Sequence, residues 1–308
     1  MATTTSPARE LTQRVVAARD ARFGLVLVAP AVLGVALFVI WPMIDAVRIS
    51  FFDRRLTTRD APFEGLSNWQ SILSDPAFLS SLGFTAIYTV LTVIGSVVLA
   101  LVLALSLIDR PLLRRIVGPL VLLPTATALI VASVGWRFVF DLRGALNRVL
   151  GVVGIERINW LGEESTARAV LIIVGIWGMT GFALLLYQAA LANVPGEVFD
   201  AARVFGRWRG IRNKATLIAP LVGRTTLVAT VVSTIITLRA FDHILALTMG
   251  GPNGTTENLA YLAWQRSFRF YDLGEGAAAS TVLMLLVFAV AGVELVLMRR
   301  MTLRGAVA

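Results

Sequence analysis

The chain has no cysteine and only one histidine, His243, among its 308 residues. The missing thiols exclude disulfides, thiolate metal sites and thiol chemistry, and the single histidine excludes a zinc site built from several histidines. Charged residues are also scarce, at 15% of the chain, whereas soluble domains have about a quarter. Hydrophobic residues make up 57% of the chain, and the mean hydropathy is +0.78. This composition indicates a membrane protein.

Six apolar stretches are long enough to cross a bilayer, whose core of roughly 30 Å needs about 20 helical residues. We expect an all-α, polytopic membrane protein with spans at about 23–44, 83–108, 116–136, 169–191, 218–238 and 276–298. The fifth stretch is the least regular because it contains Pro220 and Arg224. Glu294 lies in the last turns of the sixth stretch, close enough to the membrane boundary that we expect it to be solvated.

Basic residues are distributed unevenly between the two sides that six spans define. Sixteen of the 28 fall in the two terminal tails, the second-to-third link and the fourth-to-fifth link. Cytoplasmic loops carry such an excess, so we expect both termini in the cytoplasm. Residues 1–22 are then a cytoplasmic tail, residues 23–300 the transmembrane domain, and residues 301–308 a second cytoplasmic tail. The first apolar stretch is too long for a cleaved signal peptide.

The expected cytoplasmic loop at 193–217 contains the stretch EVFDAARVFGRWRG, residues 197–210. Apolar residues follow Glu197 at 198, 201, 202 and 205, which is the spacing of one helix face. Gly206 then permits a sharp turn before a basic segment. The residues alone leave two interpretations open. The helix lies on anionic lipid with its arginines toward the headgroups, or it fits a cleft on a cytoplasmic partner.

Three long segments are expected on the other side, at 49–78, 139–166 and 242–275. They contain GLSNW at 65–69, GALNRVLGVVG at 144–154, INWLG at 158–162 and LTMGGPNGTTE at 247–257. The Gly-Gly-Pro-Asn-Gly run predicts a turn, because glycine supplies positive φ and proline fixes the backbone. Loops of this length in a compact protein are usually functional.

Several of these stretches together resemble the permease subunits of bacterial ABC importers. Asp200-Ala201-Ala202, with Gly206 six residues after the acid and Pro220 beyond, is similar to the EAA loop of that family. Residues 247–280 are similar to the LTxGGPxxxT…Y…F…GxGAA segment of the sugar-importer branch. Residues 144–162 are similar to the GxxN…G…WL loop of the same branch.

The resemblance runs from Phe23 to Arg300 and fits the larger, maltose-permease-like type. It implies the six-span fold of type I ABC importer permeases, in the bacterial plasma (inner) membrane. It also implies three kinds of partner: a second homologous permease subunit, two ATPase subunits and an extracytoplasmic sugar-binding protein or lipoprotein. The residues that it implies for coupling to the ATPase are Glu197, Asp200, Ala201, Ala202, Phe205 and Gly206. The cargo that it implies is a carbohydrate, an oligosaccharide or disaccharide, with a glycerophosphodiester or an amino sugar as alternatives.

The chain lacks a GxxxxGK[ST] nucleotide-binding loop. We therefore expect it to be no enzyme and to bind no cofactor, with ATP and magnesium held by the partner ATPase. We expect membrane lipid as a partner and not nucleic acid, because the positive charge is concentrated in the loops and tails on one side of the spans, as is typical of membrane proteins. A self-sufficient secondary transporter is the runner-up, but it needs ionisable residues inside the spans, and their central thirds have almost none. A membrane-embedded enzyme needs a catalytic cluster that the chain does not offer.

Sugar sites combine aromatic faces with hydrogen-bonding side chains. Five residues of these types in or near the spans are candidates for the substrate pathway: Tyr88, Trp136, Trp177, Gln188 and Asp242. The alternative for each is helix packing or anchoring at the membrane boundary, where aromatic residues gather. Asp242 also has Arg239 as a nearby residue with which it can pair.

Overall fold

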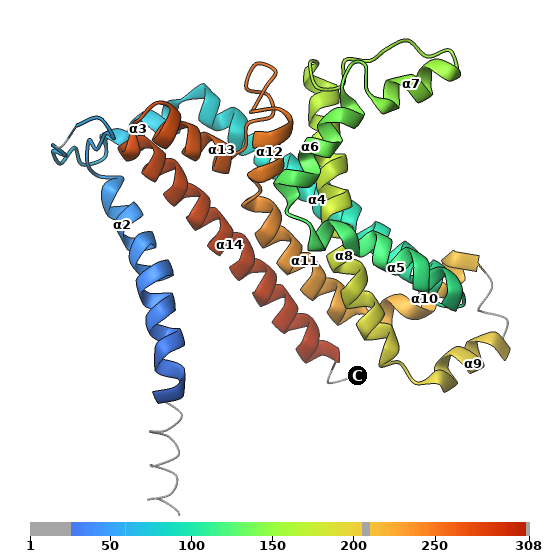
Figure 1. The fold of residues 1–308 in the computed structure, drawn as a ribbon. Coiled ribbons are helices and arrows are strands. Elements are labelled where there is room, and N and C mark those ends of the chain that lie inside the picture. Colours follow the sequence, from blue (N-terminus) through green and yellow to red (C-terminus); the bar gives the residue numbers. More distant parts are fainter. Residues whose placement is uncertain (1–25, 59, 205–209, 306–308) are drawn as a thin grey trace, which may run out of the picture.

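A computed structural model describes residues 26–58, 60–204 and 210–305. Every regular element in these residues is a helix, and the only strand-like features among them are two isolated β-bridges, Phe52 with Phe63 and Arg55 with Asp272. The expected all-α fold is therefore confirmed. The helices lie at different inclinations, and the first one stands apart from the main bundle (Figure 1).

Four continuous helices are long and apolar enough to cross a membrane. The first is Val26–Ile49, which contains the π-helical turn η1 (Ala36–Ile40) and α2 (Trp41–Ile49). The others are α4 (Pro76–Leu107), α8 (Glu164–Ala192) and α14 (Leu273–Gly305). Two further pairs of helices qualify only if each bent pair counts as one span, so the described residues contain four to six candidate spans.

The stretch predicted as one span at 116–136 is not a single helix. α5 (Pro111–Ala126) ends there and α6 (Leu129–Phe140) begins, with a bend of 105° between the two arms. Thr127 and Ala128 have the ψ angles of extended backbone, 138° and 121°, which cannot continue a helix. Pro119 and Pro124 lie inside α5 and remove two backbone donors from it. Hydropathy alone does not reveal this break.

The stretch predicted as one span at 218–238 is also divided. α10 (Gly210–Leu221) and α11 (Gly223–Leu238) meet at an angle of 83°, at Val222. Pro220 lies in the last turn of α10, where its missing N–H weakens the helical ladder. α11 alone has 16 residues, fewer than the about 20 that a perpendicular span needs.

Short helices gather at the two ends of the bundle (Figure 1). At one end, which we call the α7 end, lie α3 (Ser67–Ser74), α7 (Ala145–Val152), α12 (Asp242–Leu247), α13 (Leu259–Trp264) and the π-helical turn η2 (Gln265–Arg269). At the opposite end, which we call the α9 end, lie α9 (Gly196–Val204) and α10. The loops and amphipathic helices are thus separated from each other by the length of the long helices.

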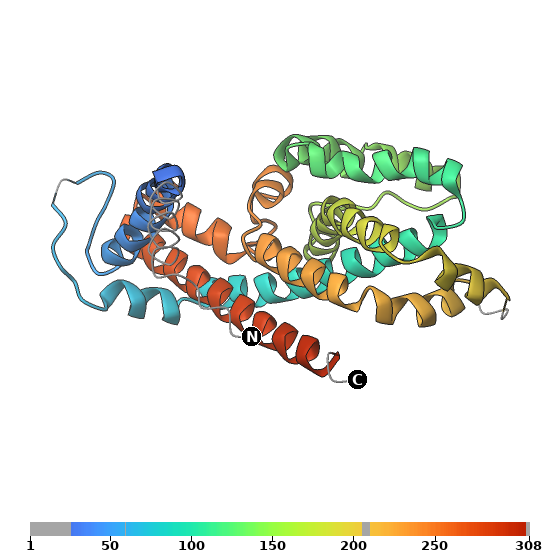
Figure 2. The same cartoon turned by 90° about the horizontal axis from the view of Figure 1, so that it is seen from below.

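The interior of the bundle is built around α8. It contacts α4, α5 and α11, and Figure 2 shows it between the layer of α5 and α6 and the layer of α4 and α11. The first helix and α14 are different, because 0% and 6% of their most apolar windows are buried. Apolar surface exposed on this scale marks a lipid or protein contact.

Candidate functional site

α9 is held against the bundle by one of its faces. Ala202 is buried, with 6% of its surface exposed, and Phe199 packs on the apolar cluster that includes Tyr187 and Ile218. Ala201, its neighbour in the sequence, is exposed. The two alanines therefore have different surroundings. Ala202 packs against the rest of the chain, whereas Ala201 is a small side chain on the exposed side of α9.

The opposite face of α9 is a stripe that nothing in the described residues covers. Glu197, Asp200, Ala201 and Val204 are all exposed, and their i, i+3, i+4, i+7 spacing places them on one side of the helix. Val204 has 82% of its surface exposed. We call these four residues the α9 stripe. It combines two carboxylates with a small and an apolar side chain.

One carboxylate anchors α9 and α10 to the turn between α4 and α5. Asp109 Oδ1 accepts a hydrogen bond from Arg203 Nη2 at 3.1 Å, and Asp109 Oδ2 accepts one from Lys214 Nζ at 2.6 Å. Arg203 also donates to Asp200 Oδ1 at 2.7 Å. The hydrogen bond to Asp109 raises the pKa of the Arg203 guanidinium above its ordinary value. These contacts, which we call the Asp109 clasp, join the two helices of the α9 end to α4 and α5.

Two of the predicted coupling residues, Phe205 and Gly206, lie outside the described residues. Their roles remain predictions from the sequence. Of the other four, Glu197, Asp200 and Ala201 belong to the α9 stripe, and Ala202 does not.

A cavity of about 340 Å³ lies where the α5–α6 break faces α8 and α11. Its walls include Pro124 and Thr127 from the break, Gly178 from α8, and Thr237 from the end of α11. Its size lies at the lower end of the range for small-molecule sites. Threonine hydroxyls and the backbone at the break supply hydrogen-bonding groups, so the cavity suits a polar ligand.

Tyr88 and His243 form one wall of this cavity. Their ring centroids are 5.3 Å apart, and both side chains are almost fully buried, at 2% and 1% exposed. Gly175 makes room for the tyrosine, because a Cβ there would lie 2.4 Å from the Tyr88 hydroxyl. Neither ring nitrogen of His243 has a hydrogen-bond partner among the described residues. Burial lowers the pKa of His243 to about 4, so the ring is neutral at pH 7.

The predicted substrate residues are only partly brought together. Tyr88 and Asp242 both line the cavity. Trp136 and Trp177 instead contact each other edge to face at 5.4 Å, and Trp136 stacks on Phe140. Both tryptophans are half-buried in this aromatic cluster and are absent from the cavity walls.

Gln188 is placed elsewhere, toward the α9 end. It lines a hollow of about 200 Å³ with Phe199 and Arg203, and its Nε2 is buried without a hydrogen-bond partner in the described part of the chain. The expected pair of Arg239 and Asp242 is not formed either, since no ion pair joins them within the described residues. Both line the cavity, which therefore carries one charge of each sign.

Glu294 is not solvated as the sequence suggested. Its Oε1 accepts a hydrogen bond from Thr234 Oγ1 of α11 at 2.9 Å, and its Oε2 is enclosed without a partner in the described residues. The sequence places Glu294 near the end of an apolar helix, but α14 packs against α11 there and one carboxylate oxygen, Oε2, is buried. Polar groups in this position stabilise contacts between membrane helices.

Buried asparagines explain the motifs at the α7 end. Asn147, 3% exposed, donates from Nδ2 to Leu142 O at 3.1 Å and to Ile158 O at 2.9 Å. Its Oδ1 accepts from Ile158 N and from Trp160 Nε1, both at 3.1 Å. The Asn of the ALN stretch thus holds the INWLG stretch in place. We call this arrangement the Asn147 hub.

A second asparagine works in the same way in the GLSNW stretch. Asn68 Nδ2 donates to Ser50 O at 3.1 Å and to Phe52 O at 3.0 Å, and Trp69 Nε1 donates to Ser50 Oγ at 3.1 Å. In the LTMGGPNGTTE stretch, the fully buried Thr256 donates to Gly251 O at 2.7 Å. The loops of the α7 end are therefore fixed by internal hydrogen bonds.

Sequence reasoning missed His243 and Gly175 as cavity residues. His243 had a signal, since it is the only histidine and adjoins the predicted Asp242. Gly175 had none, because its role depends on Tyr88, which is distant in the sequence.

Comparisons with known proteins agree with this architecture. No family model matches the chain. The trehalose/maltose transport system permease protein of Thermococcus litoralis is 31% identical, covering 86% of this chain and 88% of the relative. The sulfoquinovosyl glycerol transport system permease protein of Agrobacterium fabrum is 32% identical, covering 91% of each. The sn-glycerol-3-phosphate transport system permease protein of the same species is 33% identical, covering 85% and 90%.

Solved structures give the same fold. A bacterial ABC transporter that imports the acidic polysaccharide alginate superposes with a TM-score of 0.79 at 21% identity, over 95% of this chain and 99% of that one. The chain is thus a helical permease subunit of an ABC importer, a non-catalytic membrane component that itself binds no cofactor. It belongs to the family of binding-protein-dependent ABC sugar permeases, which confirms the resemblance drawn from the motifs.

Proposed function

We propose that this chain is one of two membrane subunits of an ATP-driven importer in the bacterial inner membrane. Its partners are a homologous second permease subunit, two ATPase subunits and an extracytoplasmic binding protein. The exposed apolar surfaces of the first helix and α14 support contacts with lipid and with another membrane subunit. A neighbour in fold, with a TM-score of 0.78 and 20% identity, was solved with a periplasmic protein bound to alginate pentasaccharide.

The α9 end faces the cytoplasm in this proposal, and the α7 end faces outward. The support is the excess of arginine in the links and tails on the α9 side, because positive charge is retained on the cytoplasmic side of membranes. Both termini are then cytoplasmic.

The α9 stripe carries the proposal, because its four side chains are exposed and no other described residue covers them. Glu197 and Asp200 face basic residues of the ATPase, and Val204 enters an apolar pocket there. Through the Asp109 clasp, a movement of α9 is passed to α4 and α5. Both helices line the cavity, through Tyr88 and Pro124. Closure of the ATPases on ATP therefore turns the cavity outward, and hydrolysis resets it, as alternating access requires.

The cargo is a neutral carbohydrate, a disaccharide or oligosaccharide. The cavity supports this by its aromatic wall, its threonine hydroxyls and its two opposite charges, Arg239 and Asp242. A second candidate is an anionic glycerol derivative. It is favoured by the absence of an ion-pair partner for Arg239 within the described residues and by the names of two relatives.

Purification of the tagged chain from its native membrane tests the assembly. We expect an ATPase and a second permease to co-purify, and the complex in proteoliposomes to take up substrate only with ATP and a binding protein. Uptake by the single chain, driven by an ion gradient, would reject the proposal in favour of a secondary transporter. Arg239→Gln separates the two cargo classes: it leaves uptake of a neutral sugar nearly unchanged and lowers uptake of an anionic substrate.

A further inference from the structure

α7 presents an apolar surface that the rest of the described chain does not cover. Val149, Val152 and Val153 have 66%, 87% and 70% of their surfaces exposed. α7 itself lies at the edge of the molecule, away from the long helices (Figure 1). Exposure of three valines on a short helix and its following turn is unfavourable in water. Their burial in a contact with another molecule would lower the free energy.

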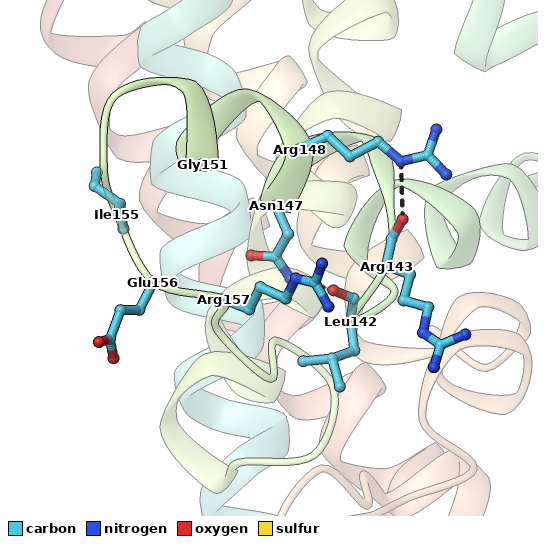
Figure 3. Close-up of a pocket in the computed structure, with 8 residues that line it drawn as sticks. All are labelled: Leu142, Arg143, Asn147, Arg148, Gly151, Ile155, Glu156 and Arg157. Carbon is cyan, nitrogen blue, oxygen red and sulfur yellow. Dashed lines mark hydrogen bonds between the residues drawn. The ribbon is translucent and has the colours of Figure 1, made fainter.

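A hollow with a positive wall lies on another side of α7, where Asn147, Arg148 and Gly151 line it. It has a volume of about 690 Å³ and is lined by Arg143, Arg148 and Arg157. Glu156 extends in the opposite direction from Arg157 (Figure 3). No ion pair involves any of the three arginines within the described residues. Glu156 also lines the hollow, so its wall carries three positive charges and one negative charge.

The frame around the hollow is built in advance of any ligand. The Asn147 hub joins α7 to the segment that carries Arg157, and Arg148 Nε donates to the backbone oxygen of Arg143 at 3.2 Å. Contact surfaces that are ordered before binding lose less entropy on association. Arginine and exposed apolar side chains around a fixed centre are typical of protein contact sites.

We propose that these residues, which we call the α7 docking surface (Arg143, Arg148, Arg157, Val149, Val152 and Val153), receive an acidic surface patch of the extracytoplasmic binding protein. The valines make the apolar contact, and the guanidinium groups pair with carboxylates around it. A lipid surface is less suitable, because the arginines surround a hollow, which admits a protruding protein segment and not a flat layer of headgroups. This inference rests on the orientation in the proposed function.

Charge reversal tests the α7 docking surface in the assembled importer. The complex is reconstituted in nanodiscs, and the probe is the purified extracytoplasmic protein that most stimulates its ATPase activity. We expect Arg148→Glu and Arg157→Glu each to raise the Kd for this protein about tenfold, since each substitution brings like charges together in the contact. Wild-type binding should weaken with added salt, and the double variant should lose most of that salt dependence. Val152→Asp should also weaken binding.

Arg54→Glu is the matched control, because Arg54 is an exposed arginine outside this surface, and it should leave the Kd unchanged. Unchanged binding in the double variant and Val152→Asp, or equal losses in Arg54→Glu, overturns the inference. The inference is also overturned if the effect of the substitutions on the Kd depends on the anionic lipid content of the nanodisc and not on the binding protein. A wild-type complex that no binding protein stimulates contradicts the proposed function itself, whereas stimulated variants with wild-type Kd values contradict only this surface.

Discussion

The two ends of the molecule are held together by different chemistry. At the α7 end, Asn147 and Asn68 are buried, and each makes several hydrogen bonds to backbone groups of another segment. At the α9 end, the polar contacts between elements are ion pairs of Asp109, whose side chain is 32% exposed, with Arg203 at 51% and Lys214 at 14% exposed.

The difference predicts which end can move. A buried amide that loses its partners leaves several polar groups unsatisfied, and each costs about 1 to 3 kcal/mol. An exposed ion pair contributes little and exchanges its partners with water at small cost. We therefore expect the α7 end to keep its shape through a transport cycle, while the α9 end is ordered loosely enough to follow a partner.

The largest effect is expected from Asn147→Ala. It removes the four hydrogen bonds of the Asn147 hub, three with Ile158 and Trp160 and one with Leu142. The free energy of unfolding should therefore fall by about 3 kcal/mol or more. Thermal and denaturant unfolding of the purified chain in detergent measures this change.

Asn159→Ala is the control for that variant. Asn159 is exposed in the same loop, and its loss should change the free energy of unfolding by less than about 0.5 kcal/mol. Equal destabilisation by both variants would show that the hub does not hold the α7 end.

The next effect is a pH dependence at the α7 end. Burial lowers the pKa of His243 to about 4, whereas the unfolded ring has a pKa of about 6.5. Below about pH 6.5 the unfolded chain takes up a proton that the folded chain refuses until about pH 4, so stability falls as the pH falls through this window. At pH 5 the loss relative to pH 7 should be about 2 kcal/mol.

His243→Gln isolates this contribution because glutamine does not titrate. We expect the variant to lose about 2 kcal/mol less than the wild type between pH 7 and pH 5, as measured by unfolding at each pH. His243→Leu serves the same comparison if the glutamine variant folds poorly. Identical pH profiles for wild type and variants would mean that the ring is accessible to protons.

The long helices were predictable from the sequence, whereas the positions and angles of their breaks were not. Uninterrupted apolar runs indicate α4, α8 and α14 because a bilayer demands length and hydropathy. The bends at Thr127 and Val222 depend on backbone angles, and proline near a helix end predicts a bend only as one outcome among several.

The candidate sites show the same limit. The helical period predicted one apolar face of residues 198, 201, 202 and 205, but Ala201 is exposed while Ala202 is buried on the other side of α9. The contact of Asp109 with Lys214 joins residues 105 positions apart, and the contact of Tyr88 with His243 likewise depends on tertiary packing. No local pattern encodes such pairs.

A smaller effect is expected in the middle of the bundle, between the rigid and the loose end. Thr234→Val removes the hydroxyl that donates to Glu294 and should lower the free energy of unfolding by about 1 kcal/mol. Glu294→Leu with Thr234→Val removes both polar groups and should restore part of the loss. A double-mutant cycle measured by unfolding in detergent gives the coupling. Additive effects would show that the two side chains do not interact.

The smallest effect on stability, and the sharpest test of the comparison, is expected from Asp109→Asn. The variant keeps the shape of the side chain but removes the charge that binds Arg203 and Lys214, and these partly exposed pairs contribute little to folding. The melting temperature should therefore hardly change. Because α9 would no longer be tied to the α4–α5 turn, the amount of substrate transported per ATP hydrolysed should fall about threefold to tenfold. This is the range in which single residues alter coupling between sites.

Asp53→Asn, which removes an ion pair with Arg55 at the α7 end, should leave the ratio of transport to ATP hydrolysis unchanged. Simultaneous measurement of uptake and phosphate release in proteoliposomes gives the ratio. An Asp109→Asn complex that melts early but transports with the wild-type ratio would reverse the assignment, making the Asp109 clasp a structural support and leaving α9 to act through another contact.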